Sequence, residues 1–89
     1  MINLLIADDN KEFDITLFNF IKKNINQINI VGICVDGLDT FEKIKELNPD
    51  VVLLDIKMPT LNGFQIVDKL ISEKINIPKI ILVTGHHEV

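Results

Sequence analysis

Stretches of apolar residues alternate along the chain with stretches in which apolar and polar residues mix at helical spacing. Four short, mostly apolar runs predict β-strands at residues 2–7, 28–35, 51–55 and 79–84. The third run is apolar up to its final aspartate. Because continuous apolar runs are typical of parallel strands that are covered on both faces, we expect a buried parallel sheet.

Three longer stretches predict amphipathic helices at residues 11–25, 38–47 and 63–74. We expect the buried face of each helix to be formed by apolar residues that recur every three or four positions. These residues are Phe13, Leu17, Phe18, Ile21 and Ile25 in the first helix, Leu38, Phe41 and Ile44 in the second, and Val67, Leu70 and Ile71 in the third.

Polar residues, glycine and proline separate these elements. Asp9 or Asn10 is a suitable N-cap for the first helix, and Asp39 with Glu42 fits a variant of the capping box in the second. The resulting order, β-α-β-α-β-α-β, predicts an α/β fold with a doubly wound parallel sheet and right-handed crossovers. The chain contains no internal repeat or linker, so we expect one domain.

Composition narrows the class of protein. The chain has 89 residues, 47% hydrophobic and 25% charged, which is typical of one small folded domain. The net charge of −4, with no arginine and scattered lysines, argues against nucleic-acid binding. The single cysteine, Cys34, lies in an apolar run, which favours a buried, unreactive thiol over a disulfide or zinc ligand. No apolar run is long enough to span a membrane, and the first residues do not resemble a signal peptide, so we expect a cytoplasmic protein.

Polar side chains follow all four predicted strands. They are Asp8 and Asp9 after the first strand, Asp36 after the second, Asp55 at the end of the third and Thr84 at the end of the fourth. In doubly wound sheets, ligands bind beyond the carboxyl ends of the strands, so we expect these residues to gather at one site. Asp36 precedes a glycine, which favours a turn residue over a ligand.

The three acids Asp8, Asp9 and Asp55 would repel one another without a positive charge between them. Mg²⁺ prefers carboxylate oxygens and keeps room for water and a phosphoryl oxygen, so we expect a magnesium site. A carboxylate at such a site also serves as a nucleophile and carries an aspartyl phosphate. Thr84 has a hydroxyl that suits donation to that phosphoryl group, although a strand-end threonine is more often structural.

Three segments resemble a known family. They are IADDN at 6–10, VVLLDIKMPTLNG at 51–63 and ILVTG at 81–85. The chain resembles the receiver domain of bacterial two-component response regulators, with the flavodoxin-like receiver fold. The resemblance implies a phosphorelay signalling role, in which a sensor histidine kinase or a phosphotransfer protein phosphorylates Asp55. It implies no separate enzyme activity, but a domain that assists its own phosphotransfer and dephosphorylation.

The resemblance also implies roles for the other site residues. Asp8 and Asp9, together with Asp55 and the backbone carbonyl of Lys57, match the residues that bind Mg²⁺. Thr84 matches the switch hydroxyl that turns toward the phosphoryl group. The backbone of Gly85 matches a contact to a phosphoryl oxygen.

The resemblance covers residues 1–89, but only about the first three quarters of a typical receiver. We therefore expect a C-terminally truncated receiver with four strands and three helices, which lacks the final strand, its lysine and the last helices. Lys79 cannot replace that lysine, because it begins the strand that Thr84 ends, some 16 Å away at about 3.3 Å per residue. We expect an impaired switch, and an exposed fourth strand through which a homodimer could form.

Two other functions remain open. One is a non-signalling, receiver-like interaction or dimerisation module in which the acids no longer act. The other is a phosphatase with an aspartate nucleophile, similar to haloacid-dehalogenase-like hydrolases. The phosphatase is disfavoured because Asp8 and Asp9 are adjacent, whereas those enzymes place two acids two residues apart after the first strand.

Overall fold

Strands and helices alternate along the chain in the predicted order. The computed structural model describes residues 1–83. The elements are β1 (Ile2–Ala7), α1 (Lys11–Asn24), β2 (Ile28–Cys34), α2 (Gly37–Leu47), β3 (Val51–Asp55), α3 (Gly63–Ser72) and β4 (Lys79–Val83). Each boundary lies within two residues of its predicted position, except that the predicted end of the fourth strand, Thr84, lies outside the described residues.

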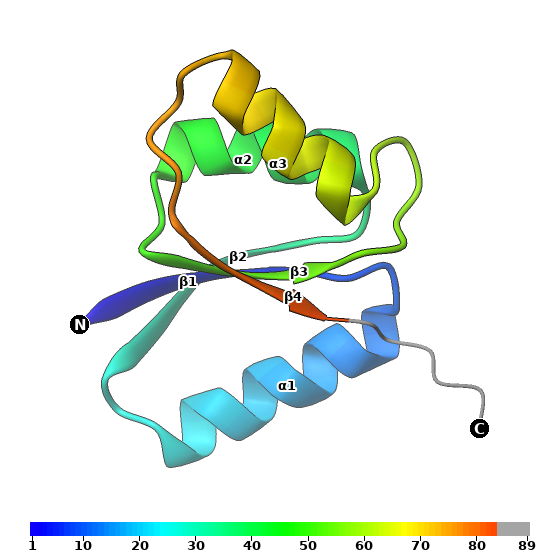
Figure 1. Ribbon diagram of the computed structural model, residues 1–89. Helices are drawn as coiled ribbons and strands as arrows, with labels where there is room; N and C mark the ends of the chain where they lie inside the picture. The colour runs from blue at the N-terminus through cyan, green and yellow to red at the C-terminus, as the bar shows by residue number, and fades with distance from the viewer. Residues whose placement is uncertain (84–89) are drawn as a thin grey trace.

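All four strands are parallel and form one sheet in the order β2-β1-β3-β4. The chain starts in the middle of the sheet, adds β2 on one side of β1, and then crosses over to add β3 and β4 on the other side (Figure 1). The predicted doubly wound α/β fold is confirmed. The direction of winding reverses between β1 and β3, so their carboxyl ends meet at the topological switch point, where such sheets bind ligands.

The helices lie on both faces of the sheet. α2 and α3 lie on one face and α1 lies on the other (Figure 1). Side chains alternate along each strand, so two hydrophobic clusters form, one on each face. The larger cluster, on the α2 and α3 face, contains Leu5, Ala7, Cys34, Phe41, Ile44, Val52, Leu54, Ile66 and Leu70. The smaller cluster, on the α1 face, contains Leu4, Ile6 and Ile21, with Val51 and Leu53 packed against it.

In each helix, one residue of the predicted buried face is exposed to solvent. Phe13, Leu38 and Ile71 are exposed by 44%, 48% and 58%, where we expected burial. A spacing of four residues drifts by about 40° per step around an α-helix, so a stripe that is buried at Ile21 has turned toward solvent at Phe13. Leu38 lies in the first turn of α2, and Ile71 lies about 100° around α3 from the buried Leu70.

The helix caps are partly as predicted. Asn10 is the N-cap of α1, and its side chain accepts a hydrogen bond from the Phe13 amide at 3.0 Å. The predicted capping box of Asp39 and Glu42 is wrong, because α2 begins earlier and Asp36 is its N-cap. A capping box does occur at the start of α3, where Asn62 and Gln65 exchange hydrogen bonds of 2.8 Å.

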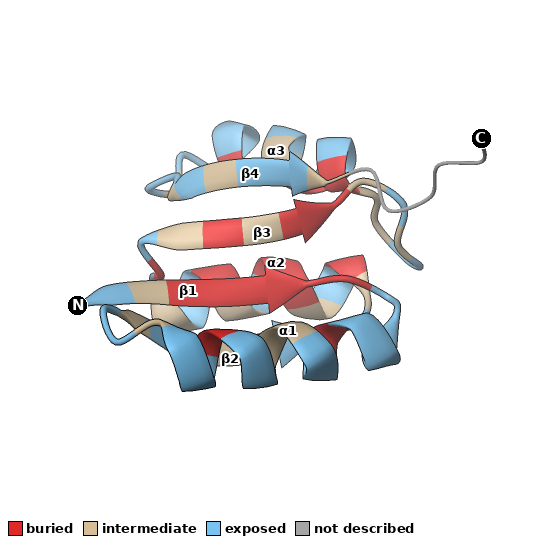
Figure 2. Ribbon diagram, turned by 90° about the horizontal axis from the view of Figure 1, so that it is seen from below, coloured by how far each residue is buried: buried red, intermediate tan, exposed pale blue. Residues whose placement is uncertain are grey.

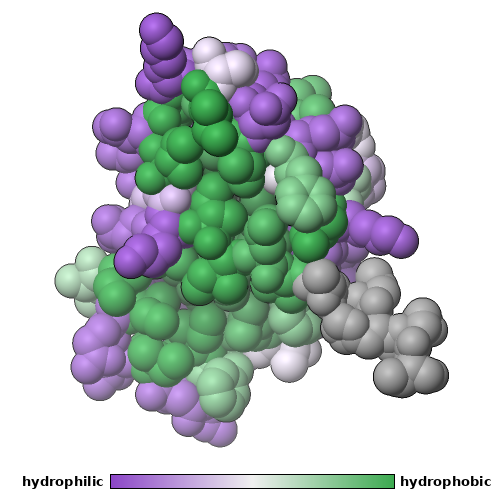
Figure 3. Space-filling model, in the orientation of Figure 1, coloured by the Kyte–Doolittle hydropathy of each residue, from purple (hydrophilic) through white to green (hydrophobic). Residues whose placement is uncertain are grey.

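β4 lies at one edge of the described sheet and carries exposed apolar side chains, including Ile81 and Leu82. Figure 2 views the α1 face and shows α1 lying over β2, whereas β3 and β4 are not covered by it. Figure 3 shows apolar side chains gathered across the face on which β4 lies. Among residues 1–83, no helix combines the length and the apolar composition that crossing a bilayer would require.

Candidate functional site

Three carboxylates meet beyond the carboxyl ends of β1 and β3. One oxygen from each of Asp8, Asp9 and Asp55 lies within 4.8 Å of the others. The register that pairs Ala7 with Leu54 brings the two strand ends level, so the residues that follow them become neighbours. Asp8 and Asp55 are buried, whereas Asp9 is exposed. The cluster is therefore open to solvent on the side of Asp9 and shielded from it on the side of the other two acids.

Backbone amides orient the two buried acids. The Asp8 amide donates to the Cys34 carbonyl at 3.0 Å, which continues the pairing of β1 with β2 by one residue. The Asp8 side chain in turn accepts a hydrogen bond of 2.9 Å from the Asn10 amide at the start of α1. The Lys57 amide donates to a carboxylate oxygen of Asp55 at 3.3 Å. Both carboxylates are therefore held in place by the turns that follow their strands.

The turn after β3 is fixed by the close approach of Gly63. The Gly63 amide donates to the Ile56 carbonyl at 2.7 Å. A Cβ atom on Gly63 would lie 3.0 Å from the Ile56 Cα atom and 3.1 Å from the Asp55 carbonyl oxygen. A side chain there would have to push the strand end away by a few tenths of an ångström, which gives the glycine of the Asp55–Gly63 motif a physical reason.

Asp36 does not join the acidic cluster. It caps α2 by accepting a hydrogen bond of 2.9 Å from the Asp39 amide, and it also accepts one of 3.3 Å from the Thr60 hydroxyl. The Thr60 hydroxyl oxygen accepts a bond of 2.8 Å from the Leu38 amide. Asp36 is thus structural, as expected, but as the N-cap of α2 rather than as a turn residue, and it ties the start of α2 to the turn after β3.

Sequence reasoning missed a fourth acid, Asp14 in α1. Asp14 is completely buried, and neither of its side-chain oxygens has a hydrogen-bond partner among the described residues. Burial raises the pKa of Asp14 from 3.8 to about 7, with smaller contributions from the charges of Asp8, Asp55 and Asp9. Its spacing contained a usable signal, because Asp14 precedes Leu17, Phe18 and Ile21 by three, four and seven positions and so shares their helix face.

The other predicted residues contribute less to the observed site. The Lys57 side chain is exposed, and its amide is the group that contacts Asp55. Thr84 and Gly85 lie outside the described residues. The Cys34 thiol is buried, and burial, followed by the charge of Asp39, raises its pKa to about 12. This thiol therefore stays protonated and unreactive near neutral pH.

The donor set of the cluster suits a hard divalent cation. Its three carboxylate oxygens are the ligands that Mg²⁺ prefers, and the exposed Asp9 leaves a side open to water. The residues present therefore fit the magnesium ion that the sequence predicts.

Comparison with known proteins identifies the family. The response regulator receiver domain family matches residues 4–89. The chain belongs to this family. The receiver fold is also found in the crystal structure of the response regulator domain of Thermotoga maritima CheB, which is 33% identical with a TM-score of 0.81, over 92% of this chain and 59% of that one. The crystal structure of a DNA-binding response regulator of the LuxR family from Staphylococcus aureus is 31% identical, with a TM-score of 0.85, over 99% of this chain and 72% of that one.

The curated relatives of this receiver are much longer proteins. A protein-glutamate methylesterase/protein-glutamine glutaminase from Lawsonia intracellularis is 33% identical over 82 residues, which make up 92% of this chain and 22% of the relative. The chain thus spans about a fifth of the length of such relatives. The receiver family is one of signalling domains, and the esterase name belongs to those longer proteins.

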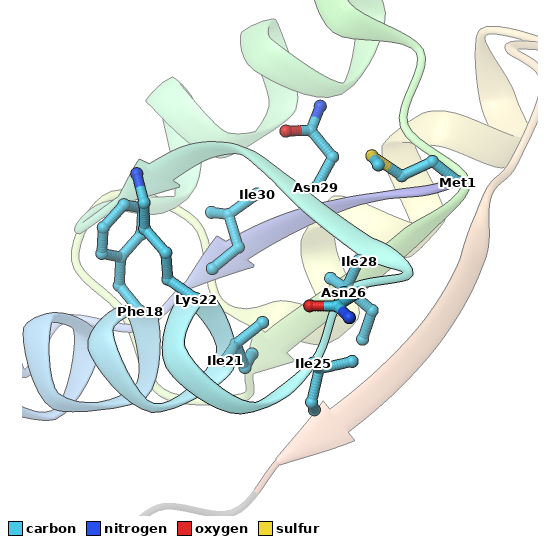
Figure 4. A pocket seen from close by; sticks show the side chains of 9 residues that line it. All are labelled: Met1, Phe18, Ile21, Lys22, Ile25, Asn26, Ile28, Asn29 and Ile30. Atoms are coloured by element: carbon cyan, nitrogen blue, oxygen red, sulfur yellow. The ribbon is translucent and has the colours of Figure 1, made fainter.

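A separate hollow of about 290 Å³ lies at the other end of the sheet. Figure 4 shows its lining, which comes from the last turns of α1, the start of β2 and Met1. Phe18, Lys22 and Asn29 are among the side chains around it. Because these residues adjoin the amino end of β2, the hollow lies away from the acidic cluster, which occupies the carboxyl ends of the strands.

Proposed function

We propose that this receiver domain accepts a phosphoryl group on Asp55 from a sensor histidine kinase or a phosphotransfer protein, and relays the signal by a conformational switch. The observation that carries the proposal is the meeting of Asp8, Asp9 and Asp55 at the switch point of a receiver fold. We further propose that the protein acts in the cytoplasm, that residues 1–89 belong to one receiver domain, and that this segment binds neither nucleic acid nor membrane.

The chemistry follows from the positions of the acids. A carboxylate oxygen of Asp55 attacks the phosphorus while the phosphorus–nitrogen bond to the donor imidazole breaks, and the leaving nitrogen keeps the electron pair. Asp8, Asp9, Asp55 and the Lys57 carbonyl would hold the Mg²⁺ ion. When bound, the ion offsets negative charge on the phosphoryl oxygens. The amide of Lys57, which donates to Asp55, keeps the attacking carboxylate oriented.

Two further residues complete the proposed switch. We assign the hydroxyl of Thr84 to the phosphoryl group after transfer, and the backbone amide of Gly85 to one of its oxygens. These assignments rest on the match of ILVTG, at residues 81–85, to the family. The domain would act as a signalling phosphoacceptor that assists its own phosphotransfer and dephosphorylation.

The test is phosphorylation by acetyl phosphate with Mg²⁺, followed by intact-protein mass spectrometry. We expect the mass of one phosphoryl group to be gained, and to be lost with hydroxylamine, as for an acyl phosphate. Asp55→Asn should abolish the gain, whereas Asp68→Asn, at an exposed acid of α3, should keep it. No mass gain in the wild type, or an unchanged gain in Asp55→Asn, would refute the proposal.

The edge strand supports a second candidate, an interaction module that dimerises through β4. A groove on the α1 face is lined entirely by apolar side chains of Ile2, Leu4, Ile21, Ile28, Val51, Leu53 and Ile81. Ile81 is 48% exposed, next to an unpaired strand edge of the described sheet. Light scattering after size-exclusion chromatography tests this candidate. It predicts a dimer that neither Mg²⁺ nor a phosphodonor changes, that Ile81→Lys disrupts, and that Ile15→Lys on α1 preserves.

A further inference from the structure

The buried face of α1 carries a fourth carboxyl, Asp14, on the side of the sheet where Asp55 lies. Along β3, Val51 and Leu53 pack on the α1 face, and the alternation of the strand places Asp55 on this face as well. Asp14 is the buried acid of α1, the helix that packs on this side of the sheet. The charges of Asp8, Asp55 and Asp9 all act on it. Asp14 therefore belongs to the surroundings of the site rather than to a separate polar cluster.

Nothing in residues 1–83 compensates the charge of Asp14. Its exposed fraction is 0%, and neither of its oxygens accepts a hydrogen bond from a described residue. The ion pairs of the described residues lie on α2 and α3, so none of them neutralises Asp14. An ionised carboxylate that is buried without a partner lowers the stability of the folded protein, and the negative charges of three neighbouring acids lower it further.

A bound cation changes this balance. Asp14 is not among the three acids whose oxygens lie within 4.8 Å of one another, so it stands outside the group that would bind an ion directly. A divalent charge at that group would attract the Asp14 carboxylate from a greater distance, through a partly buried medium in which charges are weakly screened.

We propose that Asp14 is a positioning residue of the cation site: it increases the affinity for a divalent cation and, in exchange, lowers the stability of the metal-free protein. The inference rests on the metal site of the proposed function, but not on phosphoryl transfer. It predicts two effects of opposite sign for one substitution. Asp14→Asn keeps the shape of the side chain and removes its charge, so it should stabilise the metal-free fold and weaken cation binding. A purely structural role would change stability alone.

The experiment uses the full chain at pH 8, where Asp14 is ionised because its pKa is about 7. Titration calorimetry with Mg²⁺, and separately with Mn²⁺, gives affinity, and urea unfolding in EDTA gives metal-free stability. We expect Asp14→Asn to bind about three- to tenfold more weakly, as loss of one charge near a divalent ion implies, and to unfold at higher urea. Glu12→Gln, at an exposed acid of the same helix, is the matched control. It should change the cation affinity by no more than about twofold and leave the urea-unfolding midpoint nearly unchanged.

Several outcomes overturn the inference. These are equal affinity of Asp14→Asn and the wild type, a variant that is less stable or unfolded without metal, and a wild type that binds neither cation. Phosphorylation of Asp55 tests the proposed function separately from this inference. If Asp55 is phosphorylated but Asp14→Asn binds Mg²⁺ normally, only this inference fails. If the wild type binds Mg²⁺ with the predicted dependence on Asp14 but accepts no phosphoryl group, only the proposed function fails.

Discussion

Gly37 is the position where one added carbon atom should disturb the fold most. It is the first residue of α2, and its amide donates to the Pro59 carbonyl at 2.9 Å. A Cβ atom there would lie 1.9 Å from the Leu61 carbonyl oxygen and 2.6 Å from the Leu61 carbonyl carbon. Because ordinary contacts of this kind exceed about 3 Å, Gly37→Ala has to push the turn after β3 away by about 1 Å.

Several opposing contributions set the change in folding stability that Gly37→Ala causes. The φ angle of Gly37 is not positive, so alanine adopts this backbone conformation and gains about 0.4–1 kcal/mol from a less flexible unfolded chain. Against this, overpacking costs about 1–3 kcal/mol, and displacing the turn weakens one or two hydrogen bonds, at about 1 kcal/mol each. We expect a net loss of about 2–4 kcal/mol, a large share of the roughly 4–13 kcal/mol that stabilises a domain of 89 residues.

Urea unfolding followed by far-ultraviolet circular dichroism measures this loss, since the chain has no tryptophan or tyrosine for fluorescence. Gly32→Ala is the matched control. Its nearest contact would be 3.0 Å from the Leu5 Cδ1 atom, the mobile end of a side chain, so its stability should stay within about 1 kcal/mol of the wild type. A Gly37→Ala variant as stable as the wild type, or a greater loss in Gly32→Ala, would contradict the reasoning from backbone contact.

Three further predictions concern Asp14, Cys34 and Gly63. The pKa of Asp14 is about 7 in the folded protein, against 3.8 for an ordinary aspartate. Between these pH values unfolding releases a proton from Asp14. The stability of the metal-free protein therefore falls as the pH rises from about 4 to about 7. Asp14→Asn should flatten that part of a urea-unfolding profile recorded in EDTA. The Cys34 thiol, with a pKa of about 12, should react with Ellman's reagent at pH 8 only after the protein is unfolded, and rapid reaction of the native protein would contradict this. Gly63→Ala should cost about 1–3 kcal/mol and slow phosphorylation by acetyl phosphate, because its Cβ atom would crowd the Asp55 carbonyl at 3.1 Å.

The sequence pattern was sufficient to predict the order and type of the elements. The β3 strand is apolar up to its final aspartate, and Asn10, one of the two predicted N-cap candidates, does begin α1. The N-caps Asp36 and Asn62 were not predicted. The faces of the helices were less predictable at their ends. Phe13 shows why, since apolar residues every four positions look continuous in sequence but wind around the helix and reach solvent.

The grouping of Asp8, Asp9 and Asp55 could be anticipated because parallel strands end at the same edge of a sheet. The contribution of Asp14 could not be anticipated from strand ends. It depends on which way α1 rotates over the sheet, and that rotation is set by the packing of Ile21 against β1 and β2. A charged residue within an apolar helix face was the available signal, but an aspartate in the first turn of a helix also suits a solvent-exposed position.

The residues that identify the family around Asp55 mostly hold the backbone. The Pro59 carbonyl accepts the Gly37 amide at 2.9 Å, and Gly63 packs directly on the Ile56 backbone. These contacts join the turn after β3 to the starts of both α2 and α3. Because the Lys57 amide that contacts Asp55 belongs to this turn, movement of either helix start would be transmitted to the acceptor carboxylate. Apart from Asp55 and the Lys57 carbonyl, the residues of the Asp55–Gly63 motif therefore support the acceptor acid rather than supply ligands. Substitutions at these supporting positions should alter the rate of phosphorylation through the position of Asp55, while the three cation-binding carboxylates remain present.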